Sequence, residues 1–394
     1  MYKILGLVFS TCLLLIGLNA QTTDVARVLQ EIEQNNKELK AFTSLMESRQ
    51  FELKSGNNLA DPQVETFYLP FGDHSTGDYS EFQVSQSFEF PTVYRARSNL
   101  IEAQHGQLAL EYATKRQEIL LKAQKYCHDL VFLNKRLRVE QLRMQQAKTV
   151  FDQAGELFEK KEVGILALNK AKIAWMQEQF KVQQIENDKR NLLFLLQALN
   201  GGVAIEFAQA AYFNGLSMAT RDSIWQDKLA SDPALQALRQ QEKVAMKQLR
   251  LSKNKSLPDL TAGYNYQGVA GSNFSGLYAG ISIPLWHNRN KVKAAQTNLV
   301  YRQTYGGART MVAYAGFEKQ YNNYQILLDK FQEYQATLGS MNSDALLLRA
   351  YELGEISYME YYLELQFYRQ AYDSMLEMEK QLNQLKAEIL KHRL

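Results

Sequence analysis

The chain has 394 residues, with 45 Lys and Arg against 42 Asp and Glu and a formal net charge of +3. Hydrophobic residues make up 46% and aromatic residues 11% of it, which excludes an intrinsically disordered chain. Basic and acidic residues are interleaved, so the charge pattern excludes a nucleic-acid-binding protein. Its six prolines leave residues 92–232 and 285–394 free of proline, and very long helices are possible in both stretches.

Residues 1–20 are predicted to be a signal peptide. Lys3 supplies the positive charge, residues 4–17 form the apolar stretch, and Leu18-Asn19-Ala20 is a plausible cleavage site. Cleavage leaves Cys127 as the single cysteine, which excludes an internal disulfide. No later stretch approaches the ~18 consecutive apolar residues of a membrane-spanning helix.

The rest of the chain consists of two copies of one pattern, offset by about 190–196 residues. We expect a first repeat at residues 21–200, a connecting segment at residues 201–232 and a second repeat at residues 233–394. Four pairs of short segments match in order: Asn36-Lys37-Glu38-Leu39 with Asp232-Pro233-Ala234-Leu235, Ala60-Asp61-Pro62 with Leu257-Pro258-Asp259, Pro91 with Pro284, and residues 158–164 with residues 350–354.

Each repeat is predicted to hold a short helix, two strands, a very long helix, a glycine turn and another short helix. The short helices carry apolar residues at three-four spacing, which is typical of coiled-coil packing. The long helices run from Pro91 to Gly164 and from Pro284 to Gly354, about 110 and 105 Å at 1.5 Å per residue. We therefore expect one long helix to pair with two short ones, twice per chain.

The strands are predicted from alternation of apolar and polar residues. Residues 81–90, 260–266 and 277–283 each place apolar side chains on one face, and residues 64–69 do so less clearly. Hairpins are expected to turn at residues 72–77 and 268–273, and Pro91 and Pro284 are expected to end the second and fourth strands. The polar face of the second strand consists of Glu81, Gln83, Ser85, Ser87 and Glu89.

Such strands suit a membrane barrel, although a soluble sandwich between helices also fits the pattern. Four strands cannot close on themselves with side chains inside, and their open edges would be costly in lipid. Three copies would supply twelve strands around an open lumen. The predicted fold class is therefore mainly α with a small β part: long antiparallel helices form an α-helical barrel, and four strands per chain contribute to a trimeric 12-stranded β-barrel.

The order and spacing of these features resemble those of the TolC-type outer-membrane efflux channels, over essentially the whole mature chain. The resemblance includes the Tyr-x-x-Gly-x-Ile-x-Tyr run from Tyr351 to Tyr358 and the Ala198-Leu199-Asn200-Gly201 close of the first repeat. The short chain is more similar to the cation-efflux branch. The resemblance implies a homotrimer in the outer membrane, in contact with its lipid, whose helical tunnel crosses the periplasm. The tunnel would dock on a periplasmic adaptor and an inner-membrane efflux pump.

The resemblance also implies two tips that contact the adaptor. The tip residues carried over to this sequence are Val163, Gly164 and Ile165 in the first repeat, and Leu353, Gly354, Glu355 and Ile356 in the second. We expect both glycines to permit tight helix-to-helix turns. The arginine that one family member carries after the tip glycine is replaced here by Ile356.

A periplasmic gate of acidic residues about two turns beyond the second tip glycine is likewise implied. Glu360 occupies the first gate position and Leu363 the second, while Glu364 shares the helix face of Glu360 and is the substitute we consider. A ring of such carboxylates would favour cations. The first repeat offers polar partners for these acids at comparable places: Asn169, Lys170 and Lys172.

No motif for catalysis, cofactor binding or metal binding is recognised. The neighbours Cys127 and His128 point about 100° apart on a helix, and Met375 and Met378 fit core packing. We therefore expect no enzyme activity, no cofactor and no metal site. The expected function is a passive exit duct of a tripartite efflux system. The alternatives are a periplasmic adaptor or coiled-coil scaffold, and the outer-membrane duct of type I polypeptide secretion; the exported substrate stays open.

Overall fold

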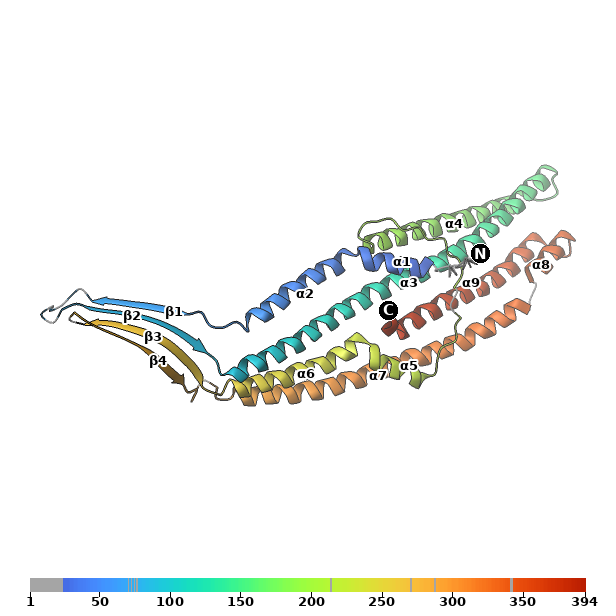
Figure 1. Ribbon diagram of the computed structural model, residues 1–394. Helices are drawn as coiled ribbons and strands as arrows, with labels where there is room; N and C mark the ends of the chain where they lie inside the picture. Colours follow the sequence, from blue (N-terminus) through green and yellow to red (C-terminus); the bar gives the residue numbers. More distant parts are fainter. Residues whose placement is uncertain are drawn as a thin grey trace, which may run out of the picture.

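The computed structural model describes residues 24–394 except residues 70, 72, 74, 76, 213, 214, 270, 287, 341 and 342. The predicted signal peptide lies outside this range, and so do parts of both predicted hairpin turns. The molecule is elongated, with a β-sheet at one end and long helices that extend away from it (Figure 1). None of the described helices is apolar enough over a sufficient length to span a membrane.

The first repeat contains the helices α1 (Asp24–Asn35), α2 (Lys37–Ser55), α3 (Pro91–Glu159) and α4 (Ile165–Leu199). The predicted opening helix is divided because the side chain of Asn36 acts at two helix ends. Its Oδ1 accepts the Leu39 N–H at 2.9 Å and caps α2, while its Nδ2 donates to the carbonyl of Leu199 at 2.7 Å at the end of α4.

The connecting segment contains α5 (Arg221–Ser231), and the second repeat contains α6 (Pro233–Asn254), α7 (Lys291–Ser340), α8 (Ser343–Glu352), α9 (Tyr358–Ile389) and the 3₁₀ helix η1 (Lys391–Arg393). Asp232 caps α6, since its Oδ1 accepts the N–H groups of Ala234 and Leu235 at 3.0 and 3.3 Å. The long helix predicted up to Gly354 corresponds to α7 and α8, which lie on either side of residues 341 and 342, outside the described residues.

The sheet contains β1 (Gln63–Leu69), β2 (Tyr79–Phe88), β3 (Asp259–Val269) and β4 (Ser272–Ser282), in the order β1-β2-β3-β4. All neighbouring strands are antiparallel. The central pair joins the two repeats, with Tyr79 opposite Val269 and Phe88 opposite Leu260. This arrangement confirms the predicted fold class for one chain, which consists of long helices and four strands.

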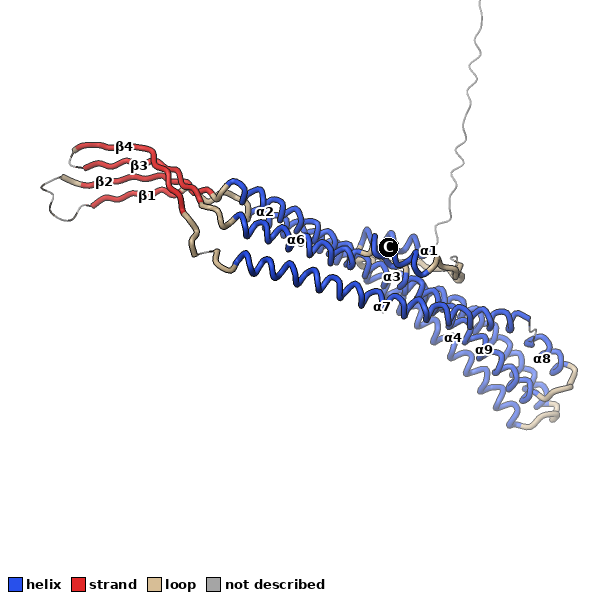
Figure 2. The backbone as a smooth tube through the Cα atoms, turned by 90° about the horizontal axis from the view of Figure 1, so that it is seen from below, coloured by secondary structure: helices blue, strands red, loops and turns tan. Residues whose placement is uncertain are grey.

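The helices form a layer in which α3 has different neighbours at its two ends (Figure 2). Near the sheet α3 packs against α2 and α6, and farther away it packs against α4 and α9. A buried cluster near the middle combines α1, α3 and α4 with Ile205 and Phe207 of the connecting segment. A second cluster combines α5, α7 and α9 around Phe317 and Tyr324. Apolar burial is therefore concentrated where the two repeats are joined.

Candidate functional site

The apolar face of the sheet is open to the surroundings. The side chains of Val64, Leu277 and Ile281 are 64%, 88% and 68% exposed. The strand register places Val64 beside Val84, and Tyr264 beside Leu277, on this same face. The predicted alternation is therefore confirmed, and the sheet presents a continuous apolar surface of the kind that contacts lipid or another protein.

The opposite face is polar and hydrogen-bonded. The carboxylate of Glu81 accepts the side-chain amides of Asn265 and Gln267 at 2.6 and 3.3 Å. Gln83 donates to the hydroxyl of Tyr278, whose ring lies over Gly263, where a Cβ would be only 2.5 Å from it. Four of the five predicted polar residues, Glu81, Gln83, Ser85 and Ser87, lie on this face. It is a surface that water can wet.

Glu89, the fifth predicted member, lies beyond the end of β2 and has a different role. Its carboxylate forms ion pairs with Arg97 at the start of α3 and with Lys255 after α6, the latter at 3.8 Å. These pairs link the sheet to the first turns of the helical layer. The sequence pattern missed this because alternation alone does not show where a strand ends.

The prolines lie just after the strands. β2 ends at Phe88, and Pro91 is the first residue of α3, with Phe90 as its N-cap. Proline suits this position because its missing N–H is not needed in the first helical turn. β4 ends at Ser282, and Pro284 lies in the loop before α7.

The two turns between helices at the far end of the molecule share one hydrogen-bond pattern. In the first, Lys161 N–H donates to Phe158 O at 2.9 Å and Glu162 N–H to Leu157 O at 2.9 Å. In the second, the N–H groups of Gly354 and Glu355 bond to the corresponding carbonyls of Tyr351 and Ala350 at 3.0 and 2.9 Å. Lys161 and Gly354, with φ of 59° and 74°, therefore occupy equivalent positions.

This equivalence corrects the predicted match of Gly164 with Gly354. Gly164 has φ −84° and is the N-cap of α4, as Ser357 is the N-cap of α9. Lys161, not Gly164, takes the left-handed conformation in the first turn. Of the two tip glycines, only Gly354 takes the left-handed conformation that glycine favours.

The other predicted tip residues surround these turns. Ile165 and Leu353 are 51% and 64% exposed, Gly164 and Glu355 are exposed, and Val163 and Ile356 are half-buried. Leu166, next to Ile165, is 72% exposed, so apolar side chains project at both turns. They provide a small apolar contact surface at each turn.

The predicted gate acid Glu360 takes part in the start of α9. Its Oε2 accepts the Ser357 N–H at 2.8 Å, while the Ser357 hydroxyl accepts the Glu360 N–H at 3.3 Å. This is a capping box, a Ser-x-x-Glu pattern that the sequence displays and our sequence analysis missed. Hydrogen bonding of its carboxylate with the backbone N–H and the side chain of Ser357 lowers the pKa of Glu360. Glu364 lies one turn further along and is exposed.

A buried cluster of charges links the two repeats between the middle of the molecule and the tips. Arg143 of α3 binds Glu140 at 2.8 Å and Asp373 of α9 at 2.9 Å. Arg369 of α9 approaches Glu178 of α4 at 3.7 Å. Sequence reasoning missed this cluster because its members lie up to about 230 positions apart. Breaking one such buried pair typically costs about 3–5 kcal/mol, so the cluster holds α9 against α3 and α4.

The neighbours Cys127 and His128 belong to the core. Burial raises the pKa of the Cys127 thiol to about 12 and lowers the pKa of His128 to about 4. Neither group is therefore ionised at neutral pH, and the Tyr212 hydroxyl donates to the His128 carbonyl at 2.9 Å. Within the described part of the chain, no group of three or more His, Cys, Asp or Glu side chains is placed to bind a metal ion.

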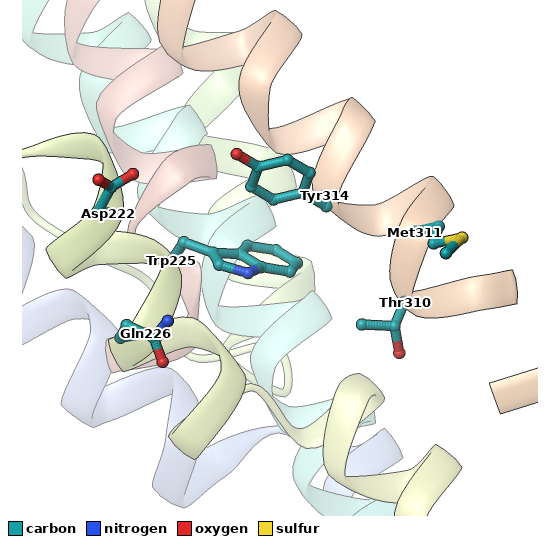
Figure 3. Close-up of a pocket in the computed structure, with 6 residues that line it drawn as sticks. All are labelled: Asp222, Trp225, Gln226, Thr310, Met311 and Tyr314. Atoms are coloured by element: carbon teal, nitrogen blue, oxygen red, sulfur yellow. The ribbon is translucent and has the colours of Figure 1, made fainter. Parts of the chain in front are cut away.

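An open pocket of about 440 Å³ lies between α5 and α7. Figure 3 shows Trp225 pointing from α5 toward α7, with Tyr314 on one side and Thr310 and Met311 on the other. The ring of Trp225 packs edge-on against Tyr314, with the ring centres 4.9 Å apart. Met311 is 75% exposed at its mouth. The pocket offers an aromatic contact surface and has no acid–base pair for chemistry.

Comparison with known proteins identifies the fold. Neither a protein-family model nor a curated protein sequence matches the chain. The structure is similar to that of CusC, a protein studied for transmembrane channel formation, with a TM-score of 0.75 at 12% identity over 93% of this chain and 92% of that chain. It is also similar to the outer-membrane protein VceC of Vibrio cholerae, with a TM-score of 0.72 at 12% identity over 93% and 95% of the two chains.

The CmeC outer-membrane channel of Campylobacter jejuni gives a TM-score of 0.68 at 14% identity, over 94% of this chain and 85% of that chain. The three matches extend over 93% to 94% of this chain. The chain has the fold of the TolC-type outer-membrane channels, as the resemblance in its sequence implied.

Proposed function

We propose that this protein is the outer-membrane exit duct of a tripartite efflux system and reaches from the outer membrane into the periplasm. One observation carries the proposal: a four-stranded sheet with an exposed apolar face and a polar face stands at the end of a long helical layer. The 69 residues of α3 alone measure about 100 Å. The similar solved structures CmeC and VceC are an outer-membrane channel and an outer-membrane protein, which supports this location.

The open edges of the sheet require further copies of the chain. Both β1 and β4 lie at an edge, and unpaired backbone groups in lipid cost several kcal/mol each. Pairing β4 of one copy with β1 of the next removes these edges. Three copies give twelve strands, a number that encloses an open lumen. The polar face with Glu81 and Gln83 would then line water, and the face with Leu277 would contact lipid.

The edges of the helical layer support the same assembly. On α4, the side chains of Ile173, Met176 and Phe180 are 54%, 54% and 66% exposed. Their spacing makes a second apolar seam on the side of α4 away from α3. On α7, Val312 and Ile326 are 62% and 66% exposed. We propose that these two seams pack against each other between neighbouring copies and close the tunnel wall.

The partners proposed are a periplasmic adaptor, an inner-membrane efflux pump and the lipid of the outer membrane. The adaptor would contact the two tips through Ile165 and Leu353, with Val163, Gly164, Gly354, Glu355 and Ile356 shaping the turns. Glu360 and Glu364 would form an acidic rim at the tunnel mouth. Nucleic acid is not among the proposed partners.

The duct is proposed to be passive and to have no catalytic role, since Cys127 and His128 are buried and un-ionised at neutral pH. The short chain favours the cation-efflux branch over drug export or type I secretion of polypeptides. An adaptor or scaffold is disfavoured because the matches extend over the sheet as well as the helices.

Fractionation and conductance measurements test this function. We expect the mature protein in the outer membrane, extracted only by detergent, as a trimer that conducts ions in planar bilayers. Deleting the gene should raise cellular accumulation of the exported metal ion or drug. A water-soluble monomer released with the periplasm would contradict the proposal. Replacing both Leu277 and Ile281 by Asp should abolish membrane insertion, whereas Asp at the exposed Ser87 on the polar face should not.

A further inference from the structure

The junction between the sheet and the helices of the second repeat carries an excess of positive charge. Between Asp259 and Glu318 the sequence contains no acidic residue. The basic residues of this stretch are Arg289, Lys291, Lys293, Arg302 and Arg309. At the matching junction of the first repeat, Glu89 forms an ion pair with Arg97. The two repeats therefore differ in charge where they meet the sheet, although they share their architecture.

The loop between β4 and α7 presents apolar side chains beside these charges. Ile283, Leu285 and Trp286 are 64%, 67% and 79% exposed, and they follow directly on the open apolar face of β4. The N–H of Arg289 bonds to the carbonyl of Trp286 at 3.1 Å, so both residues belong to one turn. At its helical end, the apolar surface of the sheet thus continues into an exposed tryptophan, and an exposed arginine follows three residues later.

The end of α6 brings a further cation to this junction. The side chain of Asn288 donates to the carbonyl of Lys255, which holds the loop beside the end of α6. Arg250, about one turn before that end, is exposed. It lies two heptads after Gln236, whose side chain bonds to the carbonyl of Ala230 in α5. Arg250 therefore lies on the side of the helical layer that carries α5.

Lys293 lies on the same side of the layer. It precedes Tyr314 by three heptads, and the ring of Tyr314 packs against Trp225 of α5 (Figure 3). In a tunnel of several copies the connecting segments must lie outside, because residues 201–232 of every copy would otherwise fill the lumen. Arg250 and Lys293 therefore face outward, next to the sheet.

These cations do not serve the fold. In the part of the chain that the structure describes, no carboxylate forms an ion pair with Arg250, Arg289 or Lys293. Lys293 lies in the first turn of α7, which has no acidic residue, and the positive end of the helix dipole disfavours a cation there. An anion from outside the chain would balance these charges.

We propose that Arg250, Arg289 and Lys293 bind the headgroup phosphate of an anionic phospholipid in the periplasmic leaflet of the outer membrane, with Trp286 at the membrane–water interface. The inference rests on the proposed function, which places the sheet in that membrane. A lipid fits better than a soluble anion because the cations adjoin the apolar surface that would contact acyl chains. Tryptophan is typical of membrane interfaces, and basic clusters beside a membrane-spanning segment attract anionic lipids.

The cluster would select lipids by their charge. The guanidinium groups of Arg250 and Arg289 can each donate two N–H groups to phosphate oxygens, and Lys293 adds a point charge. One basic residue near an anionic membrane surface strengthens binding about fivefold. Phosphatidylglycerol has a net negative charge, whereas phosphatidylcholine has a phosphate but no net charge. We therefore expect the protein to hold phosphatidylglycerol at this junction in preference to phosphatidylcholine.

Lipid retention by trimers tests the inference. The trimers are inserted into vesicles of equal parts phosphatidylglycerol and phosphatidylcholine, extracted in mild detergent and analysed for bound lipid by native mass spectrometry. We expect a preference for phosphatidylglycerol of at least about fivefold, which falls as the ionic strength is raised because salt screens the cations. The triple variant Arg250→Gln, Arg289→Gln, Lys293→Gln should lose most of this preference. Trp286→Ala should lower the retention of both lipids and keep the preference.

A matched control removes the same charges elsewhere. Arg138, Arg190 and Lys160 are exposed and lie farther from the sheet, on α3, on α4 and at the first tip. The triple variant Arg138→Gln, Arg190→Gln, Lys160→Gln should keep the preference for phosphatidylglycerol. Inorganic phosphate, added at constant ionic strength and at the concentration of the lipid phosphate, should leave the preference unchanged as well.

The outcomes separate this inference from the proposed function. Equal retention of both lipids by the unchanged protein would overturn the inference, and so would an unchanged preference in the Arg250, Arg289 and Lys293 variant. Equal losses in the two triple variants would show an effect of net charge alone, and displacement of the lipid by inorganic phosphate would show a site for a soluble anion; either result also refutes the lipid site. Trimers that do not form or do not insert would overturn the proposed function, and the inference with it.

Discussion

The two tips of the molecule have the same backbone hydrogen bonds but are formed by different residues. The second tip has Gly354 in the left-handed position and Ser357 with Glu360 as a capping box. The first has Lys161 in the left-handed position and Gly164 as N-cap, without a side-chain bond. The comparison teaches that the turn geometry is common to both repeats, whereas the local stability is not. We expect the second tip to resist opening more strongly than the first.

Gly354→Ala should have the largest effect on this difference. A Cβ at Gly354 meets no neighbouring atom. The substitution therefore destabilises the turn only by the cost of holding a residue with a Cβ in the left-handed conformation, about 1–2 kcal/mol. Hydrogen exchange of the amides around Glu355 measures it. Gly155→Ala is the control, because Gly155 lies inside α3 with open space around it and should gain up to about 1 kcal/mol. A slower exchange in Gly354→Ala would contradict the assignment.

Ser357→Ala should remove most of the extra local stability that the second tip has over the first. The loss of the cap bond to Glu360 N–H costs about 1 kcal/mol of local helix stability, and exchange of the first turn of α9 should accelerate accordingly. Ser374→Ala removes a hydroxyl of the same helix that bonds only to Gln370 O, at 2.9 Å. That variant should leave the first turn unchanged. Equal acceleration in both variants would show that the capping box is unimportant.

Lys161→Gly should make the first tip more similar to the second. Glycine relieves the left-handed strain at φ 59°, and we expect a gain of about 0.5–1 kcal/mol after its higher unfolded entropy is included. Slower hydrogen exchange at Glu162 is the readout. Lys160→Gly, at a neighbouring residue with φ −75°, should give no gain. Faster hydrogen exchange at Glu162 in Lys161→Gly would contradict the proposed equivalence of Lys161 with Gly354.

Acidification should produce the smallest effect, and only at the second tip. Bonds to Ser357 lower the folded-state pKa of Glu360 below the ordinary value of 4.5. The stabilisation is therefore complete above pH 4.5 and is lost as the pH falls through the lowered folded value. Exchange at the two tips, corrected for intrinsic rates, should converge in acid. The first tip serves as internal control because Ala167 lies where the second has Glu360, and Glu360→Gln should abolish the pH dependence.

Local patterns predicted most of the fold. The alternation at Phe82, Val84 and Phe88 defined the faces of β2, and the proline positions limited the strands and the long helices. The match of Gly164 with Gly354 failed because it assumed that glycine always takes the left-handed position, which Lys161 takes here. The Ser357-Glu360 pattern was readable and was missed.

Other parts of the site could not be read from the sequence. The ion pairs of Arg143 with Asp373 and of Arg369 with Glu178 depend on how three helices are packed. The exposure of Leu363 and Phe367 was also unforeseen, because apolar residues at helical spacing are normally buried.

The central strand pair has a consequence for how the protein reaches its native state. Tyr79 pairs with Val269 and Phe88 with Leu260. In the sequence, α3, α4, α5 and α6 lie between these partners. Contacts of such long range form slowly, because chain closure must precede them. Each repeat by itself carries only a two-stranded hairpin, which is marginally stable in isolation. The helices can therefore fold early, whereas the sheet is completed late, once the two hairpins have met.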